Sequence, residues 1–150
     1  MKNGAQVNAQ GGEYGNALQA AAYNGHEAVV ILLLERGAEV NAQGGNYGNA
    51  LQAAAYKGHE ATVGLLLERG AEVNGQGGYH GNALQAAACK GHETIVIFLL
   101  EQGAEVNAQG GEFGNALQAA AYNDNAAIIT ILLKKGAELN ACVGIASPCV

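Results

Sequence analysis

Proline, tryptophan and cysteine are scarce in this sequence of 150 residues. It has one proline, no tryptophan and three cysteines, which stand at irregular intervals as Cys89, Cys142 and Cys149. Three irregular cysteines provide neither a disulfide framework nor the paired spacing of a thiolate metal site. We therefore expect a reducing, cytoplasmic setting, and we expect no metal or other cofactor.

Positive charge is scarce as well. Seven lysine and arginine residues against 13 aspartate and glutamate residues give a formal net charge of -6. Apart from the pair Lys134-Lys135, the basic residues are scattered along the chain. Surfaces that bind nucleic acid need clustered basic residues to neutralise phosphates, so we expect no nucleic-acid partner.

Long hydrophobic runs are also absent. The apolar segment 29–34 is far shorter than the roughly 20 residues that a helix needs to cross a bilayer. The first residues, Met1-Lys2-Asn3-Gly4, lack the apolar stretch of a secretory signal. We therefore expect a soluble chain without a membrane partner.

Glycine, by contrast, is abundant, and much of it belongs to a repeat. The octapeptide Gly-Asn-Ala-Leu-Gln-Ala-Ala-Ala begins at Gly15, Gly48, Gly81 and Gly114, always 33 residues apart. Such a period predicts a stacked solenoid, in which each unit buries its apolar face only against its neighbours. We expect one elongated domain over residues 1–150, with repeats at about 4–36, 37–69, 70–102 and 103–135 and a partial repeat at 136–150.

Within one repeat, the pattern predicts two short helices. Asn49 stands before good helix formers at 50–57 and offers a side-chain oxygen to cap them. Gly58 can turn the chain at the end of this helix, and a second helix with one apolar face follows over 60–69. Both are shorter than the roughly 12 to 15 residues at which isolated helices become marginally stable, so packing between repeats has to hold them.

The inner positions and the connecting loops repeat too. We expect one buried row of leucines, with small alanines beside it that let neighbouring helix pairs approach closely. The glycine-rich segment 42–48 predicts a projecting turn or short hairpin with minimal strand content. The leucine row consists of Leu18, Leu51, Leu84 and Leu117.

These features together resemble the ankyrin repeat. The matching residues of the second repeat are Ala54-Ala55, Gly58-His59, Val63, Leu66-Leu67 and Gly70-Ala71-Glu72-Val73-Asn74. The resemblance extends from about Gly4 to Asn140. It implies an all-α ankyrin-repeat solenoid of stacked helix-turn-helix units with projecting loops or short hairpins.

The chain departs from that family at the start of each first helix. Asn-Ala-Leu-Gln, as at 49–52, replaces the family's Thr-Pro-Leu-His. Glutamine can offer amide hydrogen bonds where the histidine would bridge to a neighbour, so we predict a ladder formed by Gln19, Gln52, Gln85 and Gln118. This variant is similar to arrays in large multidomain proteins of filamentous fungi, which implies a sensing or scaffold role within a longer protein.

Histidine and cysteine do not form a predicted catalytic or metal site. His26, His59 and His92 recur one per repeat, but packed helices lie about 8–10 Å apart and a zinc-bound nitrogen about 2.0 Å from its metal. We interpret these histidines as structural residues at helix starts. Lys90 beside Cys89 suggests a mildly lowered thiol pKa, yet no base is predicted nearby. We therefore expect no enzymatic activity.

The asparagines that end each Gly-Ala-Glu-Val-Asn phrase are a further recurring feature. They resemble asparagines that are hydroxylated in some ankyrin domains. We interpret Asn41, Asn74 and Asn107 as structural turn residues instead.

Variable positions beside the fixed ones predict a binding surface. The resemblance implies a concave face formed by the loop tips and the ends of the first helices, and all but one of the tyrosines and phenylalanines fall there, Phe98 being the exception. Tyrosine is favoured in interfaces, so we expect a protein partner that presents a loop or extended segment. The alternative is that these rings stack on each other to shield the loops. The predicted partner-binding residues are Glu13, Tyr14, Tyr23, Asn46, Tyr47, Tyr56, Lys57, Tyr79, His80, Lys90, Glu112, Phe113 and Tyr122.

The ends of the array leave a second function open. Solenoids usually carry polar terminal repeats, but segment 29–34 of the first repeat is as apolar as the inner ones. Either the chain is a fragment of a longer array, or copies associate end to end. The alternative to partner binding is therefore a structural spacer or a self-assembling array fragment of a larger multidomain protein.

Overall fold

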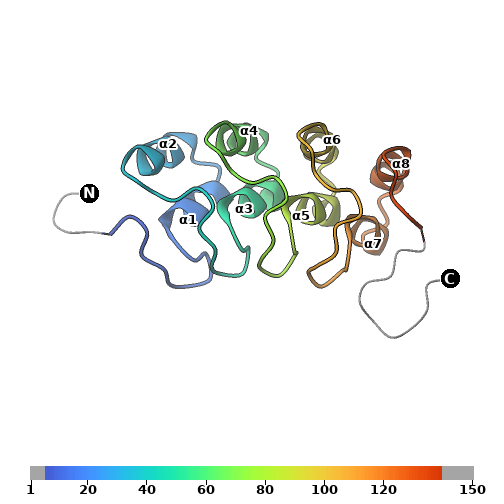
Figure 1. Cartoon of the computed structure of the whole chain (residues 1–150), viewed down its shortest axis with the longest axis horizontal. Coiled ribbons are helices and arrows are strands. Elements are labelled where there is room, and N and C mark those ends of the chain that lie inside the picture. Colours follow the sequence, from blue (N-terminus) through green and yellow to red (C-terminus); the bar gives the residue numbers. More distant parts are fainter. Residues whose placement is uncertain (1–5, 140–150) are drawn as a thin grey trace.

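The computed structural model describes residues 6–139, which form a stack of four helix pairs (Figure 1). The predicted partial repeat at 136–150 lies mostly outside these residues, as do Cys142 and Cys149. The first helices of the pairs are α1 (Ala17–Tyr23), α3 (Ala50–Lys57), α5 (Ala83–Lys90) and α7 (Ala116–Tyr122). The second helices are α2 (Glu27–Glu35), α4 (Glu60–Glu68), α6 (Glu93–Glu101) and α8 (Ala126–Lys134).

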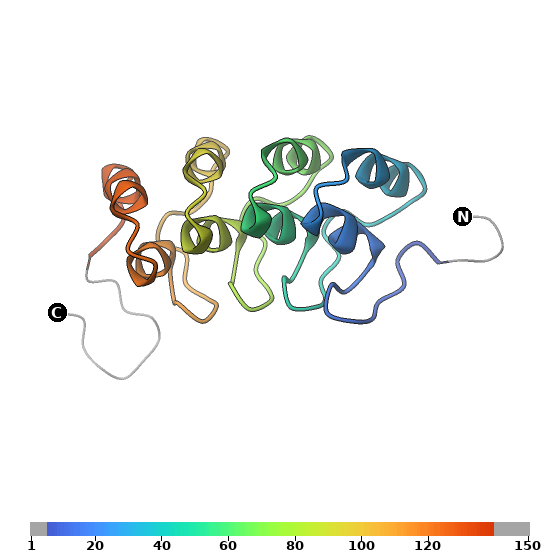
Figure 2. The same cartoon turned by 180° about the vertical axis from the view of Figure 1, so that it is seen from behind.

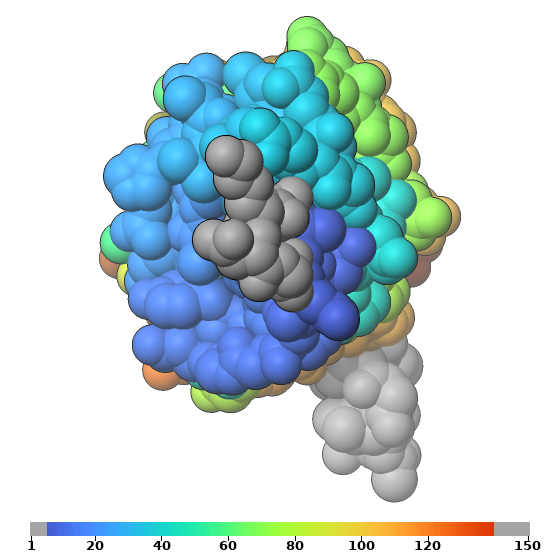
Figure 3. All heavy atoms as spheres, turned by 90° about the vertical axis from the view of Figure 1, so that its left-hand side faces the viewer, coloured from blue at the N-terminus to red at the C-terminus, as the bar shows by residue number. Residues whose placement is uncertain are grey.

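The two sets of helices form two rows, and the connecting loops project from the row of first helices (Figures 1 and 2). Within residues 6–139 there is no strand, and each loop is closed only by an isolated bridge between two glycines, as between Gly44 and Gly48. The predicted all-α stack of helix-turn-helix units is therefore confirmed. Figure 3 views the stack from the first repeat, and parts of later repeats are visible beyond the edge of the first.

The helix boundaries follow from the capping residues. Asn49 Oδ1 accepts a hydrogen bond from the Gln52 amide at 2.9 Å, and Gly58 ends α3 with a left-handed backbone at φ 81°. Each first helix has an asparagine in the same capping role. α4 begins after His59, whose side chain makes no capping hydrogen bond. The predicted starts and stops are thus confirmed.

Leucine and alanine build the core between the repeats. The leucine row is buried as predicted, with Leu18, Leu51 and Leu84 each 2% exposed. Ala53, Ala54 and their counterparts in the third and fourth repeats are fully buried, and neighbouring first helices contact each other more extensively than neighbouring second helices. Small side chains therefore hold the row of first helices close together.

Glutamine side chains join each first helix to the next loop. Gln19 Nε2 donates to the Gly48 carbonyl at 2.9 Å, Gln52 Nε2 to Gly81 at 3.2 Å and Gln85 Nε2 to Gly110 at 2.8 Å. These three glutamines are 1% exposed. Gln118 is exposed, and within residues 6–139 its side chain bonds no following loop. The predicted ladder is confirmed for its first three members.

Asparagine and histidine supply two more links between repeats. Asn41 Nδ2 donates to the Gly70 carbonyl at 3.1 Å, and its Oδ1 accepts from the Glu72 amide at 2.8 Å. The same pair of bonds recurs at the counterparts of Asn41 in the other repeats. His59 Nε2 lies 2.9 Å from the Tyr23 carbonyl and donates to it, as His92 does to Tyr56. These asparagines, His59 and His92 are therefore structural, as interpreted from the sequence, whereas the exposed His26 makes no such bond within residues 6–139.

The loop tips are joined by backbone hydrogen bonds, a link that the sequence pattern did not predict. The Asn46 amide donates to the Glu13 carbonyl at 2.7 Å, and the Tyr79 amide donates to Asn46 at 2.8 Å. The Glu112 amide continues the series to Tyr79 at 3.0 Å. A Cβ atom at Gly45 would lie 2.5 Å from the Glu13 carbonyl oxygen, so glycine permits this close approach. The tips therefore form one connected edge.

No helix within residues 6–139 is long and apolar enough to span a bilayer.

Candidate functional site

The loop tips and the C-terminal ends of α1, α3, α5 and α7 together form the surface that we call the aromatic face. It carries all of the predicted partner-binding residues. Because these come from equivalent positions of stacked repeats, they lie in parallel rows: loop-tip residues along one side and helix-end residues along the other. The backbone links between the tips hold the loop-side rows in place.

Most of the rings on this face pack against one another. Tyr23 lies 4.9 Å from both Tyr14 and Tyr47 between ring centroids, and Tyr56 lies 5.2 Å from Tyr47 and 4.8 Å from His80. Such pairs each contribute about 0.5–1.5 kcal/mol beyond their burial. These four tyrosines are only partly exposed. Mutual stacking of the aromatics, the alternative raised from the sequence, is therefore present in this part of the face.

Two lysines lie over this stack. Lys57 Nζ is 5.1 Å from the centre of the Tyr23 ring, and Lys90 Nζ is 5.1 Å from the centre of the Tyr56 ring. Both distances fit cation–π contacts. The lysine of one repeat thus covers the tyrosine of the repeat before it.

Other predicted residues are free to meet a partner. Tyr79 is 57% exposed and Tyr122 is 74% exposed. Glu13, Asn46 and Glu112 are exposed at the loop tips. They contribute side chains of both polar and acidic type along the loop edge.

His80 departs from the expectation of an exposed loop-tip row. Its side chain is 8% exposed, because the shorter imidazole lies beneath Tyr56 and beside Tyr79, whose ring centroid is 5.3 Å away. Burial lowers the pKa of His80, an effect that the Glu112 carboxylate opposes and Lys90 reinforces. The imidazole is therefore neutral at neutral pH.

The row of helix-end rings is interrupted at Cys89. The equivalent residues of the other repeats are Tyr23, Tyr56 and Tyr122. Cys89 is buried, and the side-chain amide of Asn123 lies 3.4 Å from its sulfur. Beyond the interruption, Tyr122 pairs with Phe113 at 4.7 Å. The aromatics thus form two groups with a gap between them.

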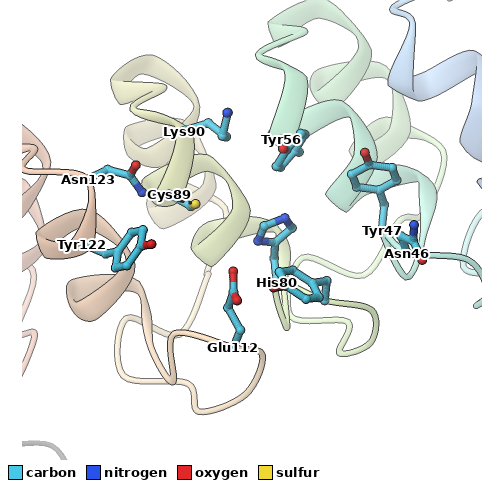
Figure 4. A pocket seen from close by; sticks show the side chains of 10 residues that line it. Asn46, Tyr47, Tyr56, His80, Cys89, Lys90, Glu112, Tyr122 and Asn123 are labelled. Carbon is cyan, nitrogen blue, oxygen red and sulfur yellow. Dashed lines mark hydrogen bonds between the residues drawn. The ribbon is translucent and has the colours of Figure 1, made fainter. Parts of the chain in front are cut away.

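A pocket of about 500 Å³ opens at this gap (Figure 4). Its volume lies within the range of roughly 300–1,000 Å³ typical of ligand pockets. The lining residues are Asn46, Tyr47, Tyr56, Tyr79, His80, Cys89, Lys90, Glu112, Tyr122 and Asn123. Of these, Cys89 and Asn123 were absent from the predicted set, although the change from tyrosine to cysteine in one row was a readable signal.

The chemistry of Cys89 differs from the sequence expectation. Burial raises the pKa of its thiol, outweighing the opposite effects of Asn123 and Lys90. The mildly lowered pKa suggested by Lys90 is therefore wrong, and the thiol is protonated at neutral pH. Within residues 6–139, no group of three or more potential metal ligands converges.

A second, smaller hollow of about 180 Å³ lies between α4 and α6, away from the aromatic face. It opens because Gly64 stands where the first and third repeats have isoleucine. Its lining is mostly apolar and carries no chemistry beyond Glu60 and Thr94 at its edge.

Comparison with known proteins gives one family. The family model described as "Ankyrin repeats (3 copies)" matches residues 1–77 and 76–142. Together these matches cover more than nine-tenths of the chain. None of the curated proteins compared with the chain matches it.

Proposed function

The chain belongs to the ankyrin-repeat family, and from this premise we propose that it is a non-catalytic module that binds a protein partner through its aromatic face. Ankyrin repeats are in general protein–protein interaction modules. We propose both the binding surface and the kind of partner. It rests above all on the two exposed tyrosines, Tyr79 and Tyr122, that flank the pocket.

Exposure of these two rings is the observation that carries the proposal. Tyr79 and Tyr122 are 57% and 74% exposed, although both stand beside rings that pack together. Tyrosine is enriched among the residues that dominate interface energetics, since it offers a large area and a polar tip. If the rings served only to pack against one another, these two rings would be expected to be more deeply buried.

The surrounding scaffold supports binding without rearrangement. Backbone hydrogen bonds join the loop tips, and glutamine side chains fix each loop to the previous helix. A surface that is already ordered loses little entropy on association. The aromatic face is long and open rather than deep, so it suits an extended segment that crosses several repeats.

The charges of the face further describe the partner segment. Lys57 and Lys90 line the helix side, whereas Glu13 and Glu112 line the loop side. A segment lying between them meets both signs. We therefore propose a partner segment of mixed or low net charge, with affinity supplied mainly by aromatic contacts.

Peptide selection tests this function. A phage-displayed library of random dodecapeptides is selected on the wild-type chain and on a Tyr79→Ala/Tyr122→Ala variant. We expect enriched sequences on the wild type only, with unchanged helical circular dichroism. The control is Ile97→Thr on α6, which introduces the residue found at the equivalent position 130. Equal enrichment on the double variant would show that the aromatic face is not the binding surface.

End-to-end association is the second candidate, and the exposure of the first repeat favours it. Val29 and Leu32 on α2 are 44% and 45% exposed, whereas Thr62 and Ile95, the equivalents of Val29, are 1% exposed. A second copy stacked on this end would cover them and could propagate. Light scattering over a concentration series should then show a rising average mass that Val29→Ser/Leu32→Ser abolishes. A constant monomer mass would rule this candidate out.

A further inference from the structure

The pocket at Cys89 lies where the row of helix-end tyrosines lacks one ring. In the first two repeats, a helix-end tyrosine fits between the loop ring of its own repeat and that of the next. Tyr23 fits between Tyr14 and Tyr47, and the four centroid distances in the two repeats run from 4.8 to 5.2 Å. At Cys89 the flanking rings remain, and the ring between them is absent.

We propose that this gap is a socket for one aromatic side chain of the partner, which completes the row. The inference rests on the proposed function, because the side chain is supplied by the bound segment. A ring at this place would face His80 of the same repeat and Phe113 of the next, as Tyr56 faces Tyr47 and His80. Contacts with both neighbours would join the two separate groups of rings.

An aromatic occupant fits the socket better than a cationic one. The face of Tyr56 that would attract a cation is already covered by the Lys90 ammonium, 5.1 Å from the ring centre. A second positive charge would meet the Lys90 ammonium as well as the Glu112 carboxylate of the lining, so it would gain little net attraction. Over Cys89, the place that lysines take in the preceding repeats is held by the neutral amide of Asn123. The socket therefore accepts an uncharged ring.

The Glu112 carboxylate on the wall favours tyrosine among the aromatic side chains. The Glu112 carboxylate projects from its loop toward the space beside Cys89 (Figure 4), where it can accept a hydrogen bond from a phenol. A phenol in the socket can therefore pair with Glu112, whereas a phenylalanine ring cannot.

The other repeats provide the decisive variant. Cys89→Tyr places in the third repeat the residue that stands in the first, second and fourth, so the fold accommodates it and the socket is filled from within. Cys89→Ala keeps the space and removes only the thiol. The first variant should lose the site, and the second should keep it.

Titration with p-cresol, the side chain of tyrosine, tests the socket directly. In ¹⁵N-labelled wild-type chain, we expect saturable shifts of the backbone amide signals of Cys89, Lys90 and Phe113. Cys89→Ala should bind with a similar constant, and Cys89→Tyr at least about tenfold more weakly. Methylguanidinium, a cationic probe, should bind more weakly than p-cresol. Absence of saturable shifts, equal binding by Cys89→Tyr, or preference for methylguanidinium would each overturn the proposal.

The selected peptides separate failure of the socket from failure of the function. If wild-type chain enriches peptides that share no aromatic residue and that Cys89→Tyr binds equally well, the socket is wrong while the function stands. If no peptide is enriched, the function fails, and the p-cresol titration still decides whether the socket exists. We expect one shared tyrosine and at least about a tenfold loss of affinity in Cys89→Tyr.

Discussion

Replacing Gln85 by leucine should destabilise the array, because this side chain joins two repeats. Its amide nitrogen donates to the Gly110 carbonyl at 2.8 Å, and the residue is 1% exposed. Leucine keeps a similar size but has no donor. The Gly110 carbonyl, which is partly buried, would then lose this partner.

The expected cost follows from the unpaired carbonyl. Leaving a buried acceptor without its partner costs about 1–3 kcal/mol, more than the net value of an ordinary hydrogen bond. Burial of the leucine methyl groups and removal of Gln85 Oε1, which is buried and has no hydrogen-bond partner within residues 6–139, offset part of this cost. For a chain of this size, each kcal/mol lowers the melting temperature by roughly 2–4 °C. We therefore expect a decrease of about 2–12 °C.

Gln118→Leu is the matched control. Gln118 occupies the same position of the last repeat, but it is exposed, and its side chain bonds no following loop within residues 6–139. Its replacement should change stability by less than about 0.5 kcal/mol. Both variants are melted by circular dichroism at 222 nm and unfolded in urea. Equal stability of the two variants would refute the role assigned to the glutamine ladder.

Three further variants probe the core, a helix and a buried titratable group. Leu51→Ala should cost about 2–5 kcal/mol in urea unfolding, because Leu51 is 2% exposed; an unchanged midpoint would contradict its place in the core. Gly64→Ala should stabilise α4 by about 0.5–1 kcal/mol, since a Cβ there meets nothing within 4 Å; a lower midpoint would contradict that open space. Burial lowers the pKa of His80 below its unfolded value of 6.5, so wild-type stability should decrease as pH falls below 6.5 toward and through that lowered pKa. His80→Tyr, with the residue of the second repeat, should lose less between pH 7 and 5 in thermal melts; identical pH profiles would contradict the burial of His80.

Repetition explains how much of the fold was predictable. Asn49, Gly58 and Leu51 act through local backbone geometry and burial, and their roles recur at a fixed spacing. Each copy therefore tests the prediction made from another. The glutamine ladder was also predictable, because an amide at a buried helix start needs partners in the neighbouring repeat.

The parts that escaped prediction depend on distances between loops. Nothing in the order of residues says that the Asn46 amide reaches the Glu13 carbonyl, since this requires the spacing of two stacked loops. The sequence places His80 in one row with Tyr14 and Tyr47 because it shares their offset. Its smaller ring is buried beneath its neighbours.

The candidate site was predictable as a surface but not as a pocket. Comparing equivalent positions located the aromatic rows, since variable residues on a fixed scaffold stand out. The gap at Cys89 can be recognised as a pocket only when the positions of the flanking rings are known, because those rings form its walls.

The affinity of a selected peptide is the most direct test of binding through the aromatic face. Its dissociation constant is measured by fluorescence anisotropy for the wild type, for Tyr79→Ala/Tyr122→Ala and for Ile97→Thr. Tyrosines that dominate an interface cost about 2 kcal/mol or more when truncated, so the double variant should bind at least about 30-fold more weakly. The Ile97→Thr control should bind like the wild type. Equal constants for all three proteins would contradict binding through the aromatic face.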